Sequence, residues 1–354
     1  MIDNKRPDSR EKTRDERNQE FFVYWAIYFK GFWRILRWSG RPYNRYRNHR
    51  SLSQFLQNYF GGLLSRDEGK HETVQFFADK KDDEKELLAA YGKALSYADV
   101  LITYNGGGFD LPFLKYRFKK NLLPFDLDLI QSFDLYRALR YYSKMRDILP
   151  NLKQKSIEAF LELSSKREDD ISGGESVELY KQYLERGSKI NEDKILLHNR
   201  DDLIQLASII KILDKLDLHR ILFHEGFTVA NRGKKALITN ISLSKKHLTV
   251  TAKTRNACSD YYSFETGYQA VHRAASKELS LTVPYESKYG ADIIDLESFN
   301  IDFSQIEKYP TYESGYLILR EKDKTSYAEI NKIVKIILSE ILDPLWYNTV
   351  ISVK

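Results

Sequence analysis

Three residues in this sequence could together hydrolyse a phosphodiester bond. Asp110 follows an apolar run and a glycine-rich turn, and His198 and Asp202 stand four residues apart in a long amphipathic segment. Hydrolysis of this kind needs an activated water and a stabilised leaving oxygen, which two divalent ions ~4 Å apart can provide when carboxylates hold them. A neutral histidine can accept the proton of that water, because its unperturbed pKa is ~6.5. The candidate chemistry is therefore metal-assisted hydrolysis.

Asp110 stands between a predicted strand and a predicted helix. The apolar run over residues 98–105 predicts a buried strand, and residues 109–120 predict a helix with Pro112 in its first turn. Ligands of open α/β sheets bind beyond the carboxyl ends of the strands, and glycines let a backbone approach closely. Asp110 is therefore a candidate metal ligand. N-capping of the helix is the alternative function of this side chain.

His198 and Asp202 lie in a run, residues 192–216, whose apolar positions are three and four apart, which predicts a long helix. Residues four apart share one helix face, so one side chain can bind a metal while the other activates water. Asp201 is an alternative ligand, although its offset of one residue turns it ~100° around the helix. A surface histidine paired with Asp202 is the simpler alternative.

These segments resemble a known superfamily. The run ITYNGGGFDLPFLKYR, residues 102–117, is similar to the second motif of the DnaQ-like exonucleases, and most similar to that of the YprB-type ribonuclease-H-like proteins. His198-Asn199-x-x-Asp202 resembles their third motif. The resemblance implies a ribonuclease-H-like fold and a 3′–5′ exonuclease that acts on DNA or RNA with Mg²⁺ or Mn²⁺. It also implies Asp110 and Asp202 as metal ligands and His198 as the general base.

The same resemblance suggests which residues meet the substrate. Tyr104 and Asn105 would position the nucleic acid or the loop, and Asp134 has counterparts that are either near the substrate or structural. Arg117 could face a phosphate, or it could be a solvated cation of the helix surface.

The first motif of the superfamily, Asp-x-Glu on the first strand, is not found in residues 1–71. Its spacing of two puts both carboxylates on one face of a strand. Three acidic pairs come near this pattern. Asp67 and Glu68 are adjacent rather than two apart, and Asp82-x-Glu84 begins a predicted helix rather than a strand. Asp295-x-Glu297 follows the third motif instead of preceding the second. The domain could bind without cutting, draw its ligands from elsewhere, or have lost its first strands to a frame error. We therefore predict an enzyme, with a catalytically degenerate nucleic-acid-binding or protein-interaction module as the alternative.

The order of predicted elements indicates an α/β fold. A divergent region, residues 1–71, precedes a ribonuclease-H-like domain over residues 72–220, in which helices flank a mixed sheet that could lack its first strands. Residues 221–354 predict a smaller α+β module. Its expected elements are a hairpin at 235–254, a helix at 266–279, a strand at 291–296 and a final helix at 327–342.

Composition adds weaker constraints. The net charge is +6, and such a modest basic excess is compatible with a polyanionic partner. The sequence has a single cysteine, Cys258, so no disulfide can form within the chain and a cytoplasmic location is expected. The charged residues 1–20 do not resemble a signal peptide, and the aromatic run 21–36 is short and interrupted by charges, so no membrane partner is expected.

Overall fold

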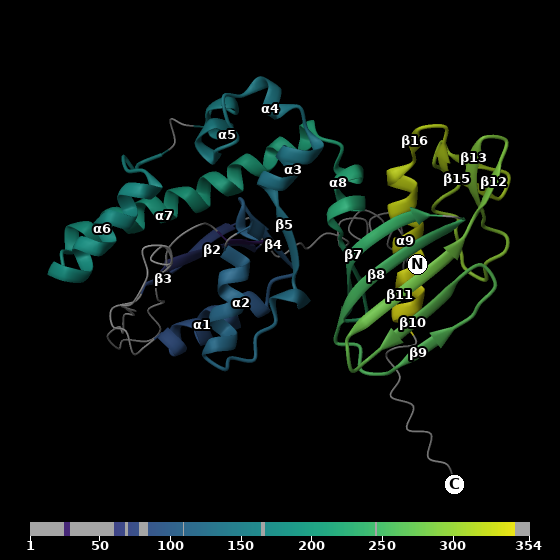
Figure 1. The fold of residues 1–354 in the computed structure, drawn as a ribbon, viewed down its shortest axis with the longest axis horizontal. Helices are drawn as coiled ribbons and strands as arrows, with labels where there is room; N and C mark the ends of the chain where they lie inside the picture. The colour runs from purple at the N-terminus through teal and green to yellow at the C-terminus, as the bar shows by residue number, and fades with distance from the viewer. Residues whose placement is uncertain are drawn as a thin grey trace, which may run out of the picture.

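The computed structural model describes residues 25–28, 60–67, 70–77, 84–108, 110–163, 167–244 and 246–343. A five-stranded sheet with its helices forms one half of the molecule, and two antiparallel sheets beside the last helix form the other half (Figure 1). In the described part of the chain, no helix combines the length and the apolarity needed to cross a membrane.

The sheet of the first half has the strand order β3-β2-β1-β4-β5. Its strands are β1 (Trp25–Tyr28), β2 (Phe60–Asp67), β3 (Lys70–Phe77), β4 (Val100–Thr103) and β5 (Gln131–Asp134). The first three strands are antiparallel neighbours, whereas β1, β4 and β5 run parallel. The register aligns Tyr28 with Thr103 and Thr103 with Asp134, so the carboxyl ends of the three parallel strands meet at one sheet edge.

This arrangement confirms the α/β class with a mixed sheet and helices around it. The possibility that the first strands are missing is wrong, because β1 and β2 come from the region before residue 72 and complete the sheet. Their sequences have no clear period of two, and partner strands rather than an alternating pattern fix their place.

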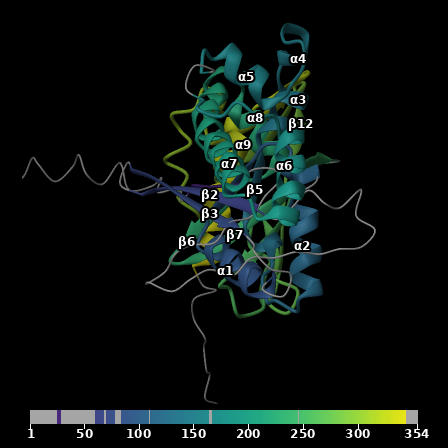
Figure 2. The ribbon, with the colours of Figure 1, turned by 90° about the vertical axis from the view of Figure 1, so that its left-hand side faces the viewer.

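Helices cover both faces of this sheet. Leu101 of β4 packs in one core cluster with α1 (Glu84–Ser96) and α2 (Asp110–Lys120), whereas the next residue, Ile102, packs in another with α7 (Lys189–Ile209). Successive strand residues point to opposite faces, so Leu101 and Ile102 pack on opposite sides of the sheet, while the start of α7 also joins the cluster of Leu101 through Ile195 and Leu196. Figure 2 shows α7 above β2 and β3, and α1 below them.

The helix that carries the third motif has a well-defined start. The preceding helix, α6 (Gly173–Arg186), begins with a capping box between Ser172 and Glu175 and ends at Gly187, whose φ is 67°. The Ser188 side chain then caps α7. The remaining helices of this half are α3 (Leu135–Tyr142), α4 (Met145–Ile148), α5 (Gln154–Phe160) and α8 (Leu218–Glu225), with 3₁₀ turns at 106–108, 127–129 and 210–215.

The second half contains two sheets and α9 (Tyr327–Leu342), which share one apolar core. The larger sheet has the order β6-β7-β8-β11-β10-β9, and the smaller one β12-β13-β15-β14 with β16 beside β15. Their bounds are β6 Thr228–Asn231, β7 Lys234–Ser244, β8 His247–Arg255, β9 Tyr261–Ser263, β10 Gln269–Arg273, β11 Glu278–Pro284, β12 Glu286–Lys288, β13 Ala291–Asp295, β14 Tyr312–Glu313, β15 Tyr316–Glu321 and β16 Lys324–Thr325. The hairpin, the strand and the final helix expected here are confirmed.

The helix predicted at 266–279 is wrong, because this segment forms β10 and the start of β11. Ala270 and His272 of β10 alternate with more exposed neighbours, and Lys277 takes a left-handed conformation with φ 56° just before β11. The residues in the turn between β10 and β11 have a high helix propensity and therefore predict a helix. The pairing of β10 with β9 and of β11 with β8 makes the segment part of a sheet instead.

Polar contacts join the two halves. Lys235 of β7 pairs with Asp99, and the Arg255 guanidinium donates to the carbonyl oxygens of Ser96 and Ala98. The Asn331 side chain of α9 donates to the carbonyl of His219 at 2.8 Å. The second half is thus attached at the amino end of β4, the end opposite to Asp110.

Candidate nucleic-acid site

Asp110 lies where its motif predicts, at the first residue of α2 beyond the carboxyl end of β4. Its side chain is buried, with 1% of its surface exposed. Burial, and then the negative charge of Asp110, raise the pKa of Tyr91, a fully buried residue of α1. The Asp110 carboxylate therefore lies close to the packing between α1 and α2.

The loop before Asp110 is held by Asp134. One carboxylate oxygen accepts the N–H of Asn105 at 2.8 Å, and the other accepts the N–H of Gly107 at 2.9 Å. The same carboxylate caps α3 through the N–H groups of Tyr136 and Arg137. Burial raises the pKa of Asp134, and these four N–H donors oppose that rise. Asp134 thus fixes the glycine loop to the end of β5.

The other residues predicted to meet the substrate have internal partners. The Tyr104 hydroxyl donates to the carbonyl of Leu152 at 2.7 Å, and its ring is buried. Asn105 has a φ of 63°, a left-handed conformation that asparagine tolerates better than most residues. Arg117 is buried and pairs with Glu84 of α1. These contacts shape the loop and the α1–α2 packing, and substrate contact by these residues stays a prediction.

A buried charge cluster surrounds the third motif on α7. Nδ1 of His198 is hydrogen-bonded to Asp169, and its Nε2 lies 3.4 Å from Asp202. The Arg167 guanidinium donates to Asp202 at 2.7 Å and to both oxygens of Glu158 at 2.6 and 2.7 Å. A third nitrogen reaches Asp169 at 3.0 Å. Arg167 thus binds three carboxylates at once, and we call these five residues the Arg167 cluster.

The electrostatics of the Arg167 cluster follow from burial and pairing. Burial works to raise the pKa of Asp169, but hydrogen bonds from His198 and Arg167 outweigh it and leave that pKa below its usual value. Burial of Asp202 outweighs its interactions with His198 and Arg167 and raises its pKa. Asp169 is therefore the more firmly ionised partner of His198.

Asp201 has a different function from Asp202, as its position around the helix predicts. Its carboxylate accepts the backbone N–H groups of Glu168 and Asp169 at 2.6 and 2.9 Å. It thereby holds the segment that delivers Arg167 to the cluster. Sequence reasoning missed Glu158, Arg167 and Asp169, and the only signal was the charged run just before the capping box of α6.

The residues present do not fit the two-metal centre that the superfamily implies. The central strand β1 has the sequence WAIY and supplies no carboxylate. Within the described residues, no group of three His, Cys, Asp or Glu side chains is arranged to hold a metal ion. Oδ1 of Asp202 is bound by Arg167, and a metal ion would compete with this guanidinium for that oxygen.

The acidic pairs considered as substitutes for the first motif lie elsewhere. Glu84 begins α1 and pairs with Arg117. Asp295 ends β13 in the second half, where its side chain accepts the N–H of Glu297 in a turn. Asp67 ends β2, whereas Glu68 and Asp82 are outside the described residues. Among the members of these pairs whose side chains the structure describes, none forms an ion pair or side-chain hydrogen bond with the Arg167 cluster.

Comparison with known proteins agrees with this architecture. Residues 52–214 match the family model of the RNase H superfamily, whose nucleases generally use divalent metals. No curated protein matches the sequence. A solved family B DNA polymerase from the hyperthermophilic archaeon Pyrobaculum calidifontis matches at a TM-score of 0.38 and 14% identity, over 54% of this chain and 24% of the polymerase. The chain thus spans about a quarter of that polymerase, a likeness too distant to support an argument. The family match supports an RNase H-like α/β fold and a nuclease-like function connected with nucleic acid.

Proposed function

We propose that this protein binds DNA or RNA through its RNase H-like domain and holds the strand without hydrolysing it. The family match over residues 52–214 supports nucleic acid as the partner. The loop of Asn105 and the α7 residue His198 follow the two motifs expected of such a domain. We assign the binding to the domain predicted at 72–220 together with strands β1 and β2, which precede it. The module 221–354 supports this domain at the end of the sheet opposite to Asp110.

The observation that carries the absence of hydrolysis is the pairing of Asp202 with Arg167. This guanidinium already neutralises Asp202 while it bridges Glu158 and Asp169. A metal ion at Oδ1 of Asp202 would compete with a guanidinium that also holds two other buried carboxylates, and disturbing that buried pairing is unfavourable. With no carboxylate in β1 either, the ligands for a metal-bound water are lacking.

Fluorescence anisotropy in excess chelator tests the binding directly. Labelled single and double strands of DNA and of RNA, long enough to span the domain, would be titrated with the full chain at several salt concentrations. We expect saturable binding that weakens as salt rises, because contacts to phosphates release counterions. No binding of any strand at low salt by folded protein would exclude the proposal.

A second candidate is a metal-dependent 3′–5′ exonuclease, favoured by the retained second and third motifs. In that case Asp110 and Asp202 would bind Mg²⁺ or Mn²⁺, and His198 would accept the proton of the attacking water. Calorimetric titration with Mn²⁺ separates the two candidates. Stoichiometric Mn²⁺ binding that Asp110→Asn abolishes would favour the exonuclease, whereas no Mn²⁺ binding by either protein is the expected result.

A further inference from the structure

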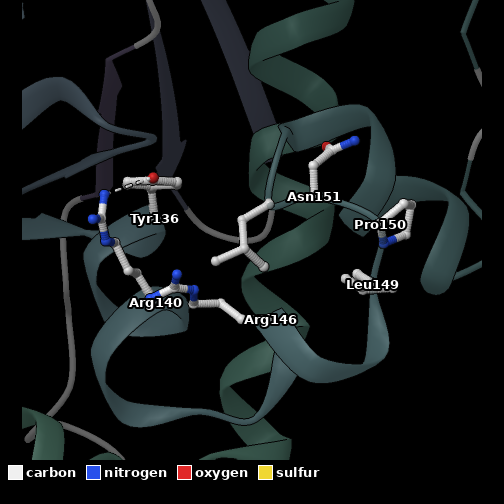
Figure 3. Close-up of a pocket in the computed structure, with 7 residues that line it drawn as sticks. Tyr136, Arg140, Arg146, Leu149, Pro150 and Asn151 are labelled. Carbon is white, nitrogen blue, oxygen red and sulfur yellow. Dashed lines mark hydrogen bonds between the residues drawn. The ribbon is translucent and has the colours of Figure 1, made fainter.

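A cavity of about 350 Å³ opens between α3 and α4, on the surface of the RNase H-like domain. We call it the arginine pocket, and its main lining residues are Tyr136, Arg140, Arg146, Pro150, Asn151 and Leu152. Figure 3 shows the two arginine side chains on one side of this pocket, with Pro150 and Asn151 across from them. The pocket therefore combines two guanidinium groups with a side-chain amide.

The arginine pocket is strongly cationic. Arg140 and Arg146 are both exposed, and within the described residues no carboxylate lies in ion-pair distance of either. Arg140 donates to the Tyr136 hydroxyl at 3.1 Å, which orients its guanidinium toward the pocket. Lys144, between the two helices, adds a further exposed positive charge. Two guanidinium groups that line one pocket, neither in an ion pair with a described carboxylate, favour an anionic ligand.

An exposed aromatic ring lies beside these cations. Tyr141 has 55% of its surface exposed, which is a large exposed area for an aromatic side chain. The guanidinium carbons of Arg137 and Arg140 lie 5.7 and 5.4 Å from the centre of its ring. Arg137 also pairs with Glu225, which fixes its position. Rings among cations of this kind form the platforms on which unpaired bases stack.

The arginine pocket shares its wall with the candidate nucleic-acid site. Tyr136, which lines the pocket, donates its N–H to Asp134, and Asp134 holds the loop that leads to Asp110. Leu152, another lining residue, accepts the hydroxyl of Tyr104 from the same loop. A strand that reaches this loop could therefore continue into the pocket.

We propose that the arginine pocket binds a phosphate of a single-stranded nucleic acid while Tyr141 stacks on a neighbouring base. This inference rests on the proposed function and specifies its substrate class. A phosphate can accept bidentate hydrogen bonds from both arginines, and Asn151 can donate to a further oxygen. A single strand is required because the bases of a duplex are stacked on one another and are not available to an exposed ring.

The test compares four forms of the full chain in chelator with labelled single and double strands of DNA and RNA. They are wild type, Arg140→Gln/Arg146→Gln, Tyr141→Ala, and a control, Arg186→Gln/Arg273→Gln, which removes two exposed arginines from α6 and β10. For the pocket variant we expect the slope of log affinity against log salt to fall by about 0.7, the value for one phosphate of a single strand. Tyr141→Ala should weaken single-strand binding about 5- to 150-fold. The control should bind as wild type does.

The outcomes separate this inference from the function on which it rests. If the pocket variant and Tyr141→Ala both bound as tightly as wild type, the inference would be overturned and the proposed function would stay intact. Equal losses for single and double strands would also overturn it, because the pocket would then read only backbone charge. Failure of wild type to bind any strand would remove both proposals. Arg140→Lys/Arg146→Lys guards against misfolding, since it keeps the charge and should recover part of the affinity.

Discussion

Arg167 is the cation on which three buried carboxylates depend. It donates to Glu158, Asp169 and Asp202, and its side chain is only 8% exposed. Arg167→Gln should lower the free energy of unfolding by about 3–5 kcal/mol, because it leaves buried negative charges without their partner. Urea unfolding measures this change.

Arg200→Gln is the matched control for that experiment. Arg200 pairs with Glu168 at 2.5 Å, where both side chains are exposed, and more weakly at 3.4 Å with buried Asp201, which keeps its two backbone N–H donors without it. Water screens such a pair, so the loss should stay below about 1 kcal/mol. Equal losses for the two variants would contradict the buried charge cluster described above.

His224 provides a pH-dependent signal near the junction of the two halves. Burial, and then the positive charge of Arg220, lower its pKa below the usual 6.5, while Glu225 works the other way. The folded state thus favours neutral His224, so its contribution to stability is full above pH 6.5 and declines as the pH falls from 6.5 through the lowered pKa. NMR titration should show a pKa below 6.5 that rises in Arg220→Gln. An unchanged pKa in that variant would contradict the proximity of the two charges.

At the residue scale, the sequence predicted positions better than functions. The motifs placed Asp110 at the start of a helix beyond a strand, and His198 and Asp202 on one helix face. Arg167 could not be foreseen, because it comes from a loop outside any motif and only the folded chain brings it to α7. The partner of a buried carboxylate depends on such distant approaches, which periodicity does not encode.

Gly226 is the tightest point at the element scale, where α8 turns into β6. Its φ is 84°, and a Cβ atom here would lie 2.0 Å from the carbonyl oxygen of Ile238. Gly226→Ala should therefore destabilise the protein by more than the ~1 kcal/mol that a left-handed conformation alone costs an alanine. Thermal unfolding measures the effect.

Gly233 offers the comparison that isolates the close approach. Its φ is 77°, but no atom lies within 4 Å of the place that an added Cβ atom would take. Gly233→Ala should show only the cost of the conformation, about 1 kcal/mol. Equal melting temperatures for the two variants would contradict the close approach of the Ile238 carbonyl in β7 to the turn between α8 and β6.

The elements that sequence predicted well are those whose local pattern and tertiary surroundings agree. The long helix α7 has both an apolar period and a serine cap, and β4 is a short apolar run before a glycine turn. The segment 266–279 failed because alanines and charged residues in its turn favour a helix, whereas its neighbours β8 and β9 impose a sheet. Strands β1 and β2 were missed because pairing alone identifies them.

At the scale of the whole molecule, the fold could be predicted but its activity could not. Strands alternating with helices already indicated an α/β domain, and the sheet order β3-β2-β1-β4-β5 completes it. Hydrolysis depends on whether carboxylates from separate strands converge. The proposal of binding without hydrolysis rests on the sequence WAIY at β1 and on the pairing of Asp202 with Arg167.

The most direct test of this account is the length of an end-labelled single strand after incubation with the protein. DNA and RNA strands would be followed with Mn²⁺, with Mg²⁺ and with chelator, using wild type and Asp110→Asn, while anisotropy reports the bound fraction. We expect bound strands of unchanged length under every condition. Metal-dependent shortening from the 3′ end by wild type, lost in Asp110→Asn, would contradict the account and establish the exonuclease.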